Sequence, residues 1–69
     1  MPFAELEPVV LAVDLPERNL RAGARGVVVL VCTVPNLAYQ VEFFDDEGEA
    51  IFPFTVLPEQ LKAAAEERG

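Results

Sequence analysis

The sequence predicts a small all-β domain, and three features of the chain support this prediction. Two runs, Pro8–Val13 and Val27–Val34, are rich in β-branched residues, as strands are. A third run, Ala38–Asp45, alternates between an apolar and a polar face. Turn and breaker residues separate the runs. With 69 residues, 52% of them hydrophobic, the chain is long enough for one domain over residues 1–69 with one small core.

The first predicted strand, Pro8–Val13, leads into a long surface loop over Asp14–Gly26. An Ala-Gly pair in this loop predicts a tight turn, because Gly23 can take the positive φ that a type II turn requires. Gly26 is the structural residue that opens the second strand, Val27–Val34. This strand is hydrophobic on both faces, which predicts a strongly bent strand shared by the two halves of a barrel.

The third predicted strand, Ala38–Asp45, follows a turn at residues 35–38 and carries two distinct faces. Its core face has three large side chains: Tyr39, Val41 and Phe43. Its opposite face has two polar residues and one aromatic residue: Gln40, Glu42 and Phe44. Since Phe44 points away from the core, we expect it to be an exposed apolar anchor beside acidic residues unless the tail helix covers it; interface centres use such residues.

Four acidic residues surround Gly48 directly after this strand: Asp45, Asp46, Glu47 and Glu49. A calcium loop of the EF-hand type places its oxygen ligands at alternate positions over about twelve residues, and this spacing is absent. We therefore predict a hairpin loop over 45–48, with Gly48 in a left-handed conformation and the acids solvated. Weak binding of divalent cations is the alternative.

The last third of the chain predicts an edge strand and a helical end. Pro53 cannot donate to a ladder, so Ala50–Val56 is expected to be an edge strand or to carry a bulge. If the last strand is missing or short, either Ala50–Val56 or Pro8–Val13 offers an edge to which a partner strand could add. Leu57–Leu61 predicts one helical turn, and residues 62–69 predict a frayed helical tail. Whether Leu61–Ala65 is helix or a final strand stays open. Together these elements predict an SH3-like, partly open barrel of four to five antiparallel strands.

The composition argues against an enzyme. The chain has no histidine, so the commonest general base and metal ligand is missing, and it has no serine. Cys32 lies within an apolar strand and is interpreted as a buried structural thiol. We expect no catalytic residue, no cofactor and no metal site. One cysteine allows no intrachain disulfide, which favours the cytoplasm, and the longest apolar run is too short to cross a bilayer.

The charge distribution favours a protein partner. Twelve acidic and five basic residues give a net charge of −7, so nucleic acid is an unlikely ligand and an anionic membrane is disfavoured. Three of the five bases lie within eight residues: Arg18, Arg21 and Arg25. They are either solvated or paired with the chain's own acids, or they contact an acidic partner. Because the acids crowd a different segment, a bipolar molecule is expected.

The aromatic residues allow two interpretations. Five of them could form a cage for a methylated lysine: Tyr39, Phe43, Phe44, Phe52 and Phe54. Alternation instead favours a core role for Phe43 and for one of Phe52 and Phe54. The leading functional hypothesis is a non-enzymatic module that binds one cognate protein, as antitoxin or immunity partners do. Its predicted contact residues are Phe44, Glu42, Gln40, Arg18, Arg21 and Arg25. A structural homo-oligomer is an alternative.

Three segments also resemble a known family: "LRAGARGVVV", "YQVEFFDDEG" and "TVLPEQL". They are similar to the DUF4926 family of short bacterial proteins, a domain of unknown function, over roughly Glu5 to Leu61. The resemblance implies no catalytic or ligand residues. The first of these segments also resembles the glycine turn of KOW-type modules, which contact RNA and ribosomes. A KOW-like RNA- or ribosome-associated module is therefore a further alternative, although such modules are usually basic.

Overall fold

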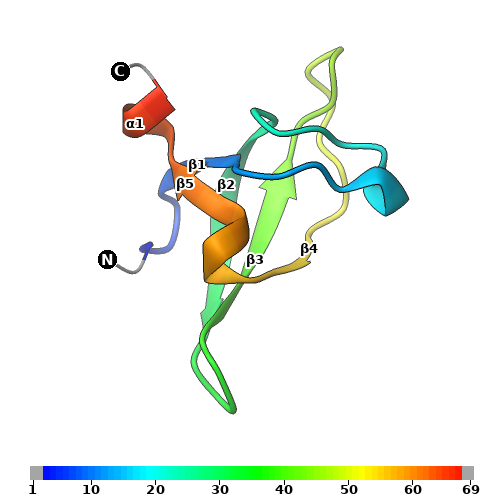
Figure 1. The fold of residues 1–69 in the computed structure, drawn as a ribbon. Coiled ribbons are helices and arrows are strands. Elements are labelled where there is room, and N and C mark those ends of the chain that lie inside the picture. Colours follow the sequence, from blue (N-terminus) through cyan, green and yellow to red (C-terminus); the bar gives the residue numbers. More distant parts are fainter. Residues whose placement is uncertain (1–2, 68–69) are drawn as a thin grey trace.

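The computed structural model describes residues 3–67, in which five antiparallel strands form one open sheet (Figure 1). The predicted all-β fold is confirmed. The strands run in the order β4-β3-β2-β1-β5. Their bounds are β1 Pro8–Leu11, β2 Arg25–Cys32, β3 Ala38–Phe43, β4 Phe54–Val56 and β5 Leu61–Ala63. The described residues also contain three single helical turns: the 3₁₀ turns η1 (Pro16–Arg18) and η2 (Pro58–Gln60) and the α-helical turn α1 (Ala64–Glu67). None of the helices within residues 3–67 has the length and apolarity needed to cross a membrane.

Strand β3 shows the predicted alternation. Tyr39, Val41 and Phe43 are fully buried, whereas the intervening Gln40 and Glu42 are half-buried on the outer face. The inward side chains form the centre of the core because β3 lies between β2 and β4. The hydroxyl of Tyr39 is satisfied despite its burial, since its oxygen accepts the backbone N–H of Phe3 at 3.0 Å.

Strand β2 contains a bulge that explains why it is apolar on both faces. Its pairing with β3 shifts between Val28 and Leu30, so Val29 is an extra residue without a partner. Before the bulge, Val28 points into the core; beyond it, Val31 packs against the core and Leu30 is left 44% exposed. A bulge bends the strand that carries it, as predicted for this segment.

The long first loop contributes to the core, which the sequence did not predict. Leu15 and Leu20 pair through two backbone hydrogen bonds of 2.9 and 3.1 Å and are each only 6% exposed. Beyond them lies the predicted type II turn. Gly23 has a φ of 93°, and the N–H of Ala24 donates to the carbonyl of Arg21 at 3.0 Å. The carboxylate of Asp14 accepts the N–H of Ala22 at 2.9 Å and ties the turn to the start of the loop.

The sequence left open whether Leu61–Ala65 is a helix or a final strand, and the structure shows a short strand followed by one helical turn. Leu61–Ala63 is strand β5, paired with β1, and only Ala64–Glu67 is helical. The prediction of a helical tail over 62–69 is therefore wrong for Lys62 and Ala63, and residues 68–69 lie outside the described residues. Because this last strand is present, β1 pairs with both β2 and β5 and is not the alternative edge. The helical turn at η2 is confirmed.

Strand β4 is shorter than predicted and forms one edge of the sheet. Only Phe54–Val56 pairs with β3, and Pro53 directly precedes this strand. A proline directly before an edge strand removes no ladder hydrogen bond, which agrees with the prediction that Pro53 marks an edge strand. The open sheet thus ends in β4 on one side and in β5 on the other.

Candidate partner-binding groove

Two charged loops lie side by side at one end of the sheet. Residues 19–25, here called the arginine turn, and residues 44–48 at the acidic hairpin line an open groove of about 1100 Å³. Figure 1 shows the turn before β2 next to the hairpin that follows β3. We refer to this feature as the charged groove. Three of the six predicted contact residues line it: Arg21, Arg25 and Phe44.

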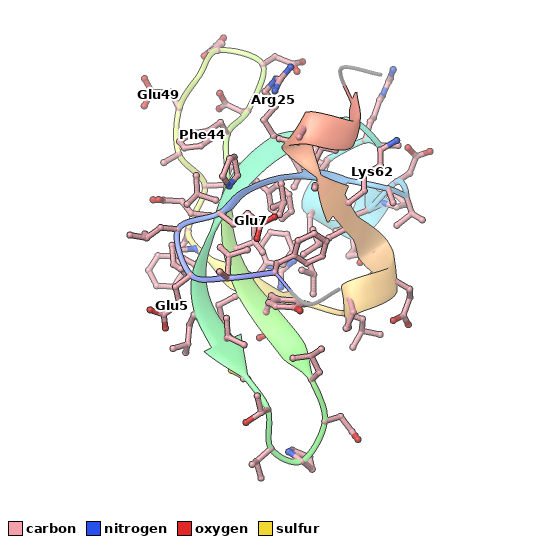
Figure 2. All side chains as sticks on the ribbon, turned by 90° about the vertical axis from the view of Figure 1, so that its left-hand side faces the viewer. Glu5, Glu7, Arg25, Phe44, Glu49 and Lys62 are labelled. Atoms are coloured by element: carbon pink, nitrogen blue, oxygen red, sulfur yellow. The ribbon has the colours of Figure 1, made fainter. Side chains whose placement is uncertain are left out.

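Strand register places the two loops together. Gly26 pairs with Phe43, so Arg25 and Phe44 are the next neighbours along the same two strands. The backbone N–H of Phe44 donates to the carbonyl of Arg25 at 3.0 Å. Figure 2 shows Arg25, Phe44 and Glu49 at the same end of the molecule. The expectation of a bipolar molecule is therefore wrong, because antiparallel pairing brings the start of β2 beside the end of β3.

The acidic hairpin has the predicted turn structure. Gly48 has a φ of 83°, and its N–H donates to the carbonyl of Asp45 at 2.9 Å. One carboxylate oxygen of Asp45 accepts two more N–H groups, from Glu47 and from Glu49, both at 2.9 Å. The Asp45 carboxylate thus stabilises the turn through hydrogen bonds to the backbone of its own loop. Within residues 3–67, no group of three or more acidic or cysteine side chains is placed to hold a metal ion.

Replacement of Asp45 tests this view of the hairpin. We expect Asp45→Ala to lower the free energy of unfolding by about 1 kcal/mol, because two backbone N–H groups lose their acceptor at an exposed site. In a domain of this size, that change corresponds to a fall in Tm of roughly 4–8 °C. Thermal unfolding followed by circular dichroism measures it. Asp45→Asn keeps an acceptor oxygen and should lose clearly less; equal losses would contradict the capping role.

The two walls of the groove carry opposite charges that do not neutralise one another. Arg21 and Arg25 are exposed on one wall, and Asp46 and Glu47 are exposed on the other. In the part of the chain that the structure describes, neither arginine forms a salt bridge. Phe44 begins the acidic wall, and it is half-buried rather than exposed as predicted. The groove therefore presents two guanidinium groups, carboxylates and part of an aromatic ring to one ligand.

The remaining predicted contact residues lie elsewhere. Gln40 and Glu42 are on the outer face of β3 and do not line the charged groove. Arg18 lies in η1, where its guanidinium carbon is 4.1 Å from the centre of the Phe54 ring. This cation–π contact covers the edge of the core, and it borders a second, smaller groove of about 210 Å³ beside β4. Arg18 thus has a structural contact that the sequence did not reveal.

The aromatic residues divide between core and surface. Tyr39, Phe43 and Phe54 are buried, with the rings of Phe43 and Phe54 5.5 Å apart, so the core interpretation is confirmed. Phe52 is 89% exposed, so Phe54 is the one of this pair that lies in the core. Phe52 precedes β4, which begins at Phe54. Cys32 is half-buried, which corrects the expectation of a buried thiol.

The fold and the groove define the molecule as a small all-β domain with an open sheet and a two-sided charged groove at one sheet end. The chain belongs to the family described as Domain of unknown function (DUF4926), which matches residues 5–63. This span includes all five strands and both walls of the groove. No curated protein and no solved structure is significantly similar to the chain.

Proposed function

We propose that this protein is a non-enzymatic interaction module that binds one cognate protein through the charged groove. One observation carries the proposal: Arg21, Arg25 and Phe44 line the same groove as the acidic hairpin, and neither arginine pairs with a carboxylate of the described residues. Guanidinium groups favour planar, bidentate contacts with carboxylates, and they are enriched with aromatic residues at the centres of interfaces. A partner segment with an acidic and a basic side chain would match both walls.

The overall fold supports this class of function. We infer an SH3-like barrel from the strand order β4-β3-β2-β1-β5, the long loop between β1 and β2, and the 3₁₀ turn between β4 and β5. Small barrels of this type bind ligands with their loops, which a rigid sheet holds in place. A net charge of −7 favours a basic partner by steering, as expected of an antitoxin or immunity protein in the cytoplasm.

The test combines partner capture with variants of the groove. The tagged protein is used to purify its partner from the native host, and the complex is then reconstituted from the two purified proteins. We expect Arg21→Gln and Phe44→Ala each to weaken binding about tenfold, because each removes a central contact. Asn36→Asp changes the net charge by the same amount as Arg21→Gln, at an exposed turn far along β2 and β3, and should leave the affinity unchanged.

Three outcomes would contradict the proposal. Equal affinity of the Arg21→Gln and Asn36→Asp variants would show that the groove is not the interface. Recovery of ribosomal proteins and RNA, with affinity that falls steeply as salt rises, would favour the KOW-like alternative. A mass in solution that increases with concentration, without any captured protein, would favour a homo-oligomer.

A further inference from the structure

We propose that β4 is a second binding surface, which adds one short extended strand of a basic partner protein to the open edge of the sheet. The surface is separate from the charged groove. It does not depend on the function proposed above, because none of the residues that carry it lines that groove. Three features of the molecule point to it: the backbone of Phe54–Val56, the exposed apolar residues at its two ends, and the charge around it.

The backbone of β4 is open on one side. Strand β4 pairs with β3 through Phe54, Thr55 and Val56, and no strand of the described residues lies beyond it in the sheet. Within residues 3–67, these three residues have no other hydrogen bond to a loop or to a side chain. Peptide N–H and C=O groups at such an edge form the template to which an extended chain can add.

Apolar side chains flank this edge at both ends. Phe52 is 89% exposed two residues before β4, and Leu57 is 47% exposed directly after it. Thr55 is exposed between them. The smaller groove of about 210 Å³ also borders β4, between Arg18 and Gln60, and has room for a side chain of an added strand. An exposed aromatic ring beside an open edge matches the anchors found at the centres of interfaces.

The charges favour a basic strand as the occupant over a second copy of this chain. Glu59 is exposed three residues after β4, and Glu42 lies on the outer face of the neighbouring strand β3. Arg18 lies on the inward side of the edge, over the Phe54 ring. Two copies would bring together chains with a net charge of −7 each. Pro53 also lacks the N–H that a longer ladder between two β4 strands would use.

An NMR titration of the full-length, isotope-labelled protein tests the proposal with three synthetic peptides of equal length. One alternates lysine and valine, one alternates lysine and glycine, and one alternates glutamate and valine. We expect only the lysine–valine peptide to shift the amides of residues 52–57, because it alone combines strand propensity with positive charge. Higher salt should weaken this binding. The lysine–glycine peptide has the same charge without strand propensity, so it controls for non-specific attraction to an acidic protein.

Variants of Phe52 test whether its ring anchors the added strand. Phe52→Ala should weaken binding of the lysine–valine peptide about tenfold, whereas Phe52→Leu should retain most of it, and Arg21→Gln should leave it unchanged. Phe52 is so exposed that neither substitution threatens the fold. The proposal is overturned if the lysine–glycine peptide binds equally, or if the shifts map to residues 44–48. It is also overturned if β4 amides shift with protein concentration alone, or if no shift occurs at peptide concentrations of roughly 1 mM, the weak end of specific binding.

Discussion

Phe43→Ala is expected to lower the free energy of unfolding by about 3–5 kcal/mol, the loss typical of a truncated aromatic residue in a core. Phe43 is fully buried, and its ring lies 5.5 Å from that of Phe54. A domain of 69 residues has a total stability of about 3–10 kcal/mol at the usual contribution per residue. The substitution should therefore leave a large part of the protein unfolded at 25 °C. Urea denaturation followed by circular dichroism measures the change.

Phe44 provides the matched control for this experiment. The two phenylalanines are adjacent, but Phe44 is half-buried and lies outside the core cluster. Phe44→Ala should lose less than half as much stability as Phe43→Ala. Phe43→Leu keeps most of the buried volume and should also be mild. If Phe44→Ala were as destabilising as Phe43→Ala, the assignment of inward and outward faces on β3 would be wrong. A small effect of Phe44→Ala is also what makes this variant usable in the binding test.

Strand β3 was predictable because its two faces differ in environment. A strand with one face on the core and the other towards solvent repeats every two residues, and the side chains of residues 38–43 follow this period. The turn at Gly23 and the hairpin at Gly48 were predictable for a related reason. Each needs a positive φ that few residues other than glycine adopt, so the chemistry of the turn is visible in the sequence.

Features that depend on pairing between distant residues were not predictable in the same way. The bulge at Val29 reverses which apolar residue of β2 faces inward, and no local pattern marks its position. Leu15 and Leu20 lie in a loop of mixed composition, and only tertiary contact makes them core residues. The charged groove depends on register: a shift of one residue between β2 and β3 would move Phe44 to the other face. The sequence predicted three of its residues as contact residues, but it did not predict that the arginine turn and the acidic hairpin lie side by side.

Gly26→Ala is expected to be strongly destabilising, because the added methyl group has no space. A Cβ atom at this position would lie 2.8 Å from Cδ1 of Phe43, 2.8 Å from Cγ1 of Val41 and 2.9 Å from the backbone oxygen of Glu42. The last of these is a main-chain atom that cannot rotate away. Overpacking of a core usually costs about 1–3 kcal/mol, and we expect the upper part of this range. Urea denaturation again measures the loss.

Two further variants show whether crowding, and not the loss of a glycine, causes this effect. A Cβ atom added to Gly23 would meet no atom within 4 Å beyond its chain neighbours, so Gly23→Ala should lose only the roughly 1–2 kcal/mol of a left-handed conformation. Asparagine tolerates that conformation, so Gly23→Asn should be milder still, whereas Gly26→Asn should be worse than Gly26→Ala.

A double variant tests the contact between positions 26 and 43. Phe43→Leu in the Gly26→Ala background should recover part of the stability, because the two residues are in contact and their effects are not additive. Strictly additive losses would mean that the ring of Phe43 does not limit position 26 and that the crowding comes from Val41 and the main chain of Glu42. Equal losses for Gly26→Ala and Gly23→Ala would contradict the steric role of Gly26.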